Sequence, residues 1–208
     1  MERDSEPGLL IELFRCLSRI TTEDPLRCHD FTTVRRDALT ELATEVAPEE
    51  LEHVEEAVRV FVTTRSDVDA HLFADALPFL EALSSIPNLK IAMISNGNCN
   101  SSFSPVLSKF LTLSLSAADV GIAKPSVVPF IAMAQRCEVI PSRVLYIGDS
   151  LAHDVVGAKA AGMRVAWLCR TGNAEEILSK ADTRPDVVIS SLDLSVLEEK
   201  FSAWTSCS

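Results

Sequence analysis

The spacing of apolar residues divides this chain into two regions. From about residue 8 to residue 85 the apolar positions recur at helical spacing, which favours four helices. Their apolar stripes fall within residues 9–17, 34–46, 51–62 and 73–83. Pro48 stands before the third stripe, where a first helical position tolerates proline. We expect the connection over residues 21–30 to be a loop.

After Pro87 the pattern changes, because short apolar runs now alternate with helical segments. The runs cover residues 89–94, 110–115, 144–147, 163–168 and 187–189, and the helical candidates cover 126–138, 153–161, 173–181 and 192–201. Apolar runs that lack polar alternation and are separated by helices indicate a parallel sheet covered on both faces. Gly162 stands where a left-handed residue ends a helix, directly before a strand. The sequence predicts an α/β region over residues 71–208, preceded by an all-helical region over residues 1–70.

The charge and cysteine content narrow the class of protein. The 208 residues carry a net charge of −11 and show no basic stripe, so we expect neither nucleic acid nor an anionic membrane as a partner. The six cysteines form no C-x-x-C pair, which is typical of a reducing compartment. We find no secretory signal and no apolar run long enough to cross a membrane. These features predict a cytoplasmic protein.

The strongest chemical signal follows the run that ends at Ile147. Gly148 and Asp149 come directly after this run, and Asp154 opens the next predicted helix five residues later. Ligands of open parallel sheets bind outside the carboxyl ends of the strands. Carboxylates clustered there suit Mg²⁺, which prefers one or two carboxylates, waters and phosphate oxygens. Taken singly, Asp154 could equally be a helix-start carboxylate and Asp149 a turn cap.

Two further strand ends carry polar groups. Ser95 and Asn96 follow the first apolar run, where a hydroxyl and neighbouring N–H groups can hold a phosphoryl oxygen. The Asn-Gly pair is also a common turn dipeptide. Lys124 precedes Pro125, which biases the lysine toward an extended backbone. Its ammonium could neutralise an anionic nucleophile and a phosphate together, although a lysine viewed alone could equally be solvated.

These features occur in order, each at the end of a predicted strand, and together they resemble three motifs of the haloacid dehalogenase-like hydrolase superfamily. Ser95 matches its Ser/Thr motif and Lys124 its lysine motif. Asp149 and Asp154 match its acidic motif. The similarity covers roughly residues 70–190.

The resemblance implies a Rossmann-like parallel sheet with a helical cap. Members are mostly phosphatases that use Mg²⁺, and some are dehalogenases or phosphomutases, so the substrate would be a small phosphorylated or haloacid-type molecule. Ser95 and Asn96 would bind the substrate, and Lys124 would pair with the nucleophile and the phosphate. Asp149 would hold Mg²⁺ directly, with Asp154 as a ligand or as support through water.

The superfamily's nucleophile belongs to an Asp-x-Asp motif after a first apolar strand, and we find no such segment in this sequence. Asp67-Val68-Asp69 has the right spelling, but the residues before it do not form an apolar run. An aspartyl intermediate therefore has no visible source here. We expect weak Mg²⁺ binding and little turnover, or alternatively a non-catalytic binding or regulatory module, such as a truncated isoform.

The missing first strand has a structural consequence. It would lie between the strand that ends at Ser95 and the strand that precedes Asp149, so its loss predicts a slot about 9–10 Å wide, two strand spacings. Either the two strands close up or another segment fills the slot. Exposed sheet edges at this place would favour self-association.

Overall fold

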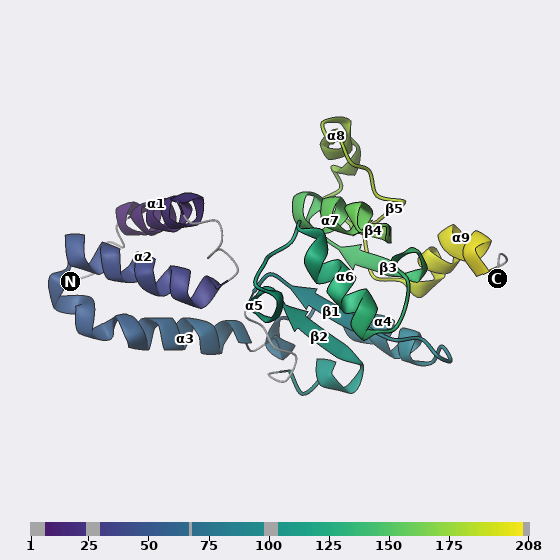
Figure 1. Ribbon diagram of the computed structural model, residues 1–208, viewed down its shortest axis with the longest axis horizontal. Coiled ribbons are helices and arrows are strands. Elements are labelled where there is room, and N and C mark those ends of the chain that lie inside the picture. The colour runs from purple at the N-terminus through teal and green to yellow at the C-terminus, as the bar shows by residue number, and fades with distance from the viewer. Residues whose placement is uncertain (1–6, 24–29, 67, 98–103, 206–208) are drawn as a thin grey trace.

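The structure, a computed structural model, describes residues 7–23, 30–66, 68–97 and 104–205. Its N-terminal part is all-helical, as the apolar spacing predicts, and the helices pack chiefly against one another (Figure 1). They are α1 (Pro7–Glu23), α2 (Phe31–Val46), the 3₁₀ helix η1 (Pro48–His53) and α3 (Val54–Ser66). Val34 and Ala38 of α2 are buried between the helices.

The second part contains five short strands, all paired in parallel. They form a two-stranded sheet, β1–β2, and a three-stranded sheet, β3–β4–β5. The strands are β1 (Ala92–Ser95), β2 (Leu113–Ser116), β3 (Leu145–Gly148), β4 (Arg164–Leu168) and β5 (Val187–Ile189). The predicted parallel α/β architecture is thus confirmed.

Helices connect and cover these strands. They are η2 (Asp69–His71), α4 (Ala76–Ser84), η4 (Leu107–Lys109), α5 (Ala117–Val120), α6 (Val127–Arg136), η5 (Pro141–Arg143), the π-turn η6 (Leu151–Val155), α7 (Val156–Ala160), α8 (Ala174–Ser179) and α9 (Leu194–Thr205). The Ser126 side chain accepts a hydrogen bond from Val128 N and caps α6. Gly162 has a φ of 78°, the left-handed conformation expected between α7 and β4.

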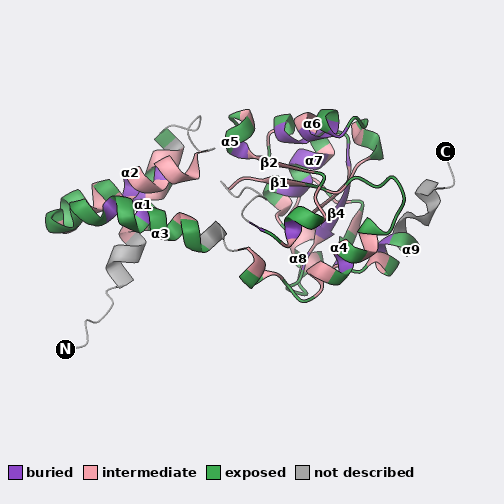
Figure 2. Ribbon diagram, turned by 90° about the horizontal axis from the view of Figure 1, so that it is seen from below, coloured by how far each residue is buried: buried purple, intermediate pink, exposed green. Residues whose placement is uncertain are grey.

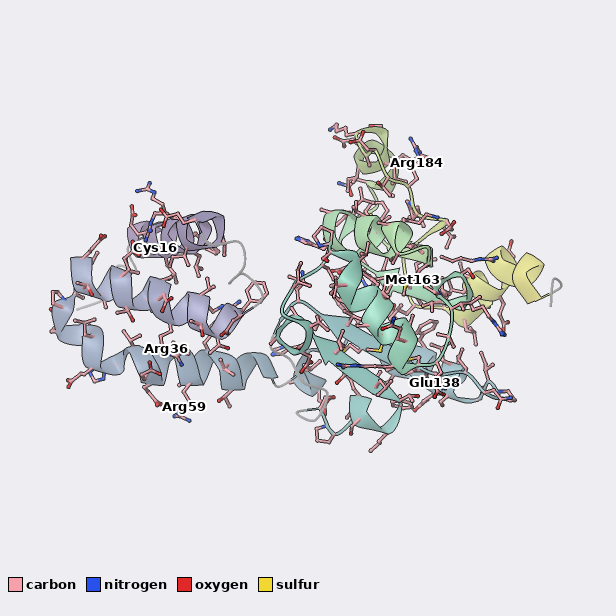
Figure 3. All side chains as sticks on the ribbon, viewed as in Figure 1. Cys16, Arg36, Arg59, Glu138, Met163 and Arg184 are labelled. Atoms are coloured by element: carbon pink, nitrogen blue, oxygen red, sulfur yellow. The ribbon has the colours of Figure 1, made fainter. Side chains whose placement is uncertain are left out.

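The core lies on both faces of the three-stranded sheet. One cluster joins α6, α7 and β4 through Phe130, Ala158 and Val165, and it includes Met163, which Figure 3 labels. A second cluster joins α4 and α9 to the sheet, with Phe79 as a buried member. Figure 2 shows buried segments on α6, α7 and β4. Helices thus cover the three-stranded sheet on both faces, as an apolar parallel sheet requires.

The strands β1 and β3 are not hydrogen-bonded to each other. Thr112 N donates to Ile91 O, so the alternating backbone turns the Ile94 carbonyl toward the other edge of β1. Arg164 N donates to Val144 O, and by the same alternation Ile147 presents its backbone to the open edge of β3. The two strands therefore do not close up into one sheet, and among the described residues no other strand pairs with their facing edges.

The segment between α3 and α4 is attached to the α/β part at two points. The Ser104 hydroxyl donates to Asp69, which ties η2 to the segment that follows β1. Arg170, directly after β4, forms an ion pair of 2.9 Å with Asp75 at the start of α4. These contacts hold both ends of the connection near the carboxyl ends of the strands.

Candidate active site at the strand ends

The side chain of Asn96 holds the backbone of Lys124. Its Nδ2 donates to Lys124 O at 3.0 Å, and its Oδ1 accepts from Lys124 N at 2.7 Å. Both polar atoms of the amide therefore bond the Lys124 backbone, while the role of Asn96 in substrate binding stays a prediction. The Ser95 hydroxyl accepts a hydrogen bond from Gly97 N at 3.0 Å, as in a turn at the end of β1.

The ammonium of Lys124 lies between the two sheets. Its Nζ is 3.3 Å from Ile94 O of β1, 3.0 Å from Tyr146 Oη of β3, and 2.6 Å from Asp154 Oδ1. An ammonium has three N–H donors, and here each of them has an acceptor. The sequence analysis expected this lysine beside a nucleophile or a phosphate. In this structure its anionic partner is Asp154.

Asp154 is 4% exposed and both of its oxygens accept hydrogen bonds. Oδ1 accepts from Lys124 Nζ and from Tyr146 Oη, the latter at 2.9 Å, while Oδ2 accepts from Ser150 N at 2.9 Å. A buried carboxylate is stable only when it is paired and hydrogen-bonded in this way. The π-turn η6 presents this side chain toward Gly148, and such turns are frequent at functional sites.

Gly148 leaves the space that Asp154 occupies. A Cβ atom at position 148 would lie 2.5 Å from both Cβ and Cγ of Asp154, closer than real side chains approach. The glycine between the apolar strand and Asp149 is therefore required by packing. It allows the π-turn to fold back over the end of β3.

Tyr146 is the site residue that the sequence analysis missed. Its ring packs edge-on against Phe130 with centroids 4.9 Å apart, and its hydroxyl joins Lys124 to Asp154. Burial, followed by the negative charge of Asp154, raises the pKa of the Tyr146 phenol above its ordinary value. A signal was present in the sequence. Alternation along a strand places Tyr146 on the same face as Gly148, over which Asp154 lies.

Asp149 is exposed to solvent, whereas Asp154 is buried. Its backbone carbonyl accepts a hydrogen bond from Trp167 Nε1 at 2.9 Å, which fixes the chain at the end of β3. The neighbouring Ser150 hydroxyl lies 3.0 Å from Nδ1 of His153, an exposed residue. The two acidic residues of the motif thus have different environments, one held by protein donors and the other facing solvent.

The residues present fit a Mg²⁺ site poorly. Asp154 already accepts three hydrogen bonds, so only Asp149 offers an exposed carboxylate. Across the described ranges, no group of three or more His, Cys, Asp or Glu side chains is arranged to hold a metal ion. Mg²⁺ demands near-octahedral oxygen ligands. We therefore derive no chemical step through a metal from this arrangement.

The one Asp-x-Asp sequence in the chain has no place in this site. Asp67 lies outside the described residues, and Asp69 accepts hydrogen bonds from the Ser104 hydroxyl and from Val106 N. Asp69 therefore anchors the segment that follows β1. No helix in the described part of the chain is long and apolar enough to cross a membrane.

Comparison with known proteins identifies the family to which this chain belongs. A family model for haloacid dehalogenase-like hydrolases matches residues 16–162, which is more than half of the chain. The chain therefore belongs to this family of hydrolases, and the resemblance seen in its motifs is confirmed.

Two proteins to which this chain is similar are haloacid dehalogenases. Over 125 residues the chain is 33% identical to (S)-2-haloacid dehalogenase 2 of Pseudomonas sp. (strain CBS-3), and the match covers 56% of this chain and 53% of that protein. The chain thus spans about half the length of this curated relative. A 2-haloacid dehalogenase from Pseudomonas syringae pv. tomato matches with a TM-score of 0.73 and 28% identity, covering 97% of this chain and 86% of that one.

A HAD phosphatase from Thermococcus onnurineus shares the fold, with a TM-score of 0.56 at 20% identity over 93% of this chain and 90% of that one. The similarity to this phosphatase concerns the fold alone. The two more similar relatives are both haloacid dehalogenases. What is shown for this chain is membership of the hydrolase family.

Proposed function

We propose that this chain forms the anion-binding part of a hydrolase site for small 2-haloacids. The carboxylate of the substrate would bind beside the ammonium of Lys124 and the hydroxyl of Ser95. The observation that carries the proposal is the placement of Lys124 Nζ between β1 and β3, within 3.3 Å of Ile94 O and 3.0 Å of Tyr146 Oη. Ligands of open parallel sheets bind outside the carboxyl ends of the strands, and this largely buried ammonium lies there.

The relatives support a haloacid over a phosphate ester. Both more similar relatives are named as 2-haloacid dehalogenases, and a dehalogenase of the same fold from Xanthobacter autotrophicus was crystallised with chloropropionic acid covalently bound. The poor fit to Mg²⁺ at Asp149 and Asp154 agrees with a substrate that is held by the hydrogen-bond donors of Lys124 and Ser95. We propose the same anionic substrate class for this chain.

The chemistry requires a nucleophile that we do not find in the sequence. A carboxylate would attack carbon 2 of the haloacid, the carbon–halogen bond would break, and the halide would leave with its electron pair. Water would then cleave the resulting ester. We propose that this nucleophile belongs to a strand between β1 and β3, so that the chain by itself binds substrate without turning it over.

A phosphomonoester is the second candidate substrate, and one observation favours it. Asp149 is exposed at the end of β3, where a carboxylate could act on Mg²⁺ brought by a phosphorylated ligand. A non-catalytic binding module is a third possibility, and we also propose that the open edges of β1 and β3 allow self-association. A cytoplasmic location is part of the proposal, supported by the buried unpaired thiols of Cys16, Cys137 and Cys169.

Binding and turnover can be tested separately. We expect (S)-2-chloropropionate to bind the purified chain, and we expect Lys124→Met to abolish that binding. Halide release should be absent in this chain and should begin in a longer chain that supplies an apolar strand ending in Asp-x-Asp. Phosphate release from an aryl phosphate with Mg²⁺, measured in parallel, would favour the second candidate.

The outcome that overturns the proposal is equally direct. If the chain and Lys124→Met bind (S)-2-chloropropionate equally well, the lysine is not the anion site. Halide release by the chain itself would show that it contains a nucleophile, and Asp67 and Asp69 would be the first residues to substitute.

A further inference from the structure

Tyr146 is the one tyrosine in the chain, and its hydroxyl touches both charged side chains of the site. An ammonium can only donate hydrogen bonds and an ionised carboxylate can only accept them. The phenol must therefore accept from Lys124 at 3.0 Å and donate its single hydrogen to Asp154 at 2.9 Å. This fixes the direction of both hydrogen bonds.

The ring that carries this hydroxyl is itself held in place. Tyr146 packs edge-on against Phe130 at an interplanar angle of 67°, and Phe130 is fully buried. Edge-to-face pairs of this kind favour a defined ring position. The hydroxyl is consequently preset and does not have to be ordered when a ligand binds.

The three acceptors around Lys124 are not equivalent. Asp154 and Tyr146 lie at 2.6 Å and 3.0 Å from Nζ, whereas the Ile94 carbonyl lies at 3.3 Å, the longest of the three. The Ile94 carbonyl also belongs to the unpaired edge of β1. An incoming anion therefore displaces the Ile94 carbonyl most easily, while Asp154 and Tyr146 keep the other two N–H groups.

We propose that Tyr146 is a positioning residue that determines which N–H of Lys124 is offered to a bound anion. This inference rests on the proposed function, since it concerns the same lysine. Without the phenol hydroxyl, Asp154 is the one remaining side chain that holds the ammonium among the described residues. The ammonium can then turn about that contact, and its third N–H no longer points at the anion.

Tyr146→Phe removes only the hydroxyl and keeps the ring on Phe130. Ser104→Ala is the matched control, because Ser104 is 1% exposed and its hydroxyl bonds Asp69 and Leu107 N, outside the site. Loss of one positioned hydrogen bond should weaken (S)-2-chloropropionate binding by roughly three- to tenfold in Tyr146→Phe. Ser104→Ala should destabilise the fold without changing the affinity.

A second readout needs no ligand. The lysine ammonium signals in nitrogen-15 NMR should include a protected signal that Lys124→Met removes, which assigns it to Lys124. In Tyr146→Phe this signal should shift and exchange faster with water, and in Ser104→Ala it should be unchanged. A purely structural role for Tyr146 would not alter Lys124 selectively.

The outcomes separate the two proposals. If Tyr146→Phe leaves both the affinity and the Lys124 signal unchanged, the positioning role is refuted, while a loss of binding in Lys124→Met would keep the proposed function. Equal binding by Lys124→Met would overturn the proposed function first. If Tyr146→Phe does not fold, the chain can be produced with 3-fluorotyrosine in place of tyrosine, which changes position 146 alone. Its more acidic phenol is a weaker acceptor for Lys124, so unchanged affinity would again refute the role.

Discussion

The two sheets of this protein differ in how they are held together. In the three-stranded sheet, β4 has three consecutive buried residues, and apolar clusters cover both faces. In the two-stranded sheet, Leu115 of β2 is the one fully buried strand residue, and β1 has none. The three-stranded sheet is an apolar core. The two-stranded sheet depends on fewer apolar contacts and on polar links through Lys124.

This difference explains where the candidate site lies. Asn96 binds the Lys124 backbone from the side of β1, and Tyr146 and Asp154 bind its ammonium from the side of β3. These four residues therefore also link the two sheets and form the joint between them. Substitutions at the joint should affect stability more than substitutions of similar ion pairs that lie within one sheet.

Lys124→Met should have the largest effect. It would leave the Asp154 carboxylate, 4% exposed, without its cation, and breaking a buried pair costs about 3–5 kcal/mol. The control is Lys159→Met, whose ion pair with Asp186 has side chains about one-third exposed. Such an exposed pair should contribute about 0–1 kcal/mol. Denaturant unfolding of both variants measures the difference, and equal losses would contradict the view of Lys124 as a joint.

Gly148→Ala should be the next most harmful change. Its Cβ would lie 2.5 Å from Asp154, and overpacking of this kind costs about 1–3 kcal/mol. Denaturant unfolding would measure the loss. In an Asp154→Ala background the clash is relieved, so the additional cost of Gly148→Ala should shrink there. An unchanged additional cost would show that the glycine is required by the backbone and not by the carboxylate.

Much of this arrangement could be predicted from the sequence. The helical spacing before residue 66 and the apolar runs after Pro87 predict the two kinds of region, and the run at 187–189 matches β5 in both bounds. The predicted boundaries differ from the observed ones in places: the apolar run covers residues 110–115, whereas β2 is Leu113–Ser116. Pattern alone cannot distinguish an apolar approach segment from the hydrogen-bonded strand that follows it.

The site could be predicted only in part. The residue types at Ser95, Lys124 and Asp154 were identified from their places at strand ends, but their partners were not. A sequence pattern does not show which donors a buried carboxylate will accept hydrogen bonds from, because the outcome depends on distances. Tyr146 was overlooked because a tyrosine inside an apolar run is usually a core residue.

The phenol of Tyr146 gives a pH test of the same joint. Burial and the charge of Asp154 raise its pKa above the ordinary value of 10.0, which the unfolded chain would show. Ionisation of this phenol therefore does not change the free energy of unfolding below pH 10. Above pH 10 the unfolded chain loses the proton first, so the free energy of unfolding falls by about 1.4 kcal/mol for each pH unit. Tyrosinate absorbance should rise at a higher pH in the folded chain than in the unfolded chain. Absorbance that rises near pH 10 in the folded protein would place the hydroxyl in solvent.

Asp149→Asn should have the smallest effect, because the residue is exposed and lies outside the hydrogen bonds of the joint. Its stability should change by no more than about 0.5 kcal/mol. One exposed carboxylate gives Mg²⁺ few of the oxygen ligands it needs, so calorimetry should show no micromolar Mg²⁺ affinity in either the native chain or the variant. Micromolar affinity that disappears in Asp149→Asn would instead show that Asp149 is a ligand of the metal. That result would favour the phosphate substrate, because phosphate oxygens and waters can supply the ligands that one carboxylate does not.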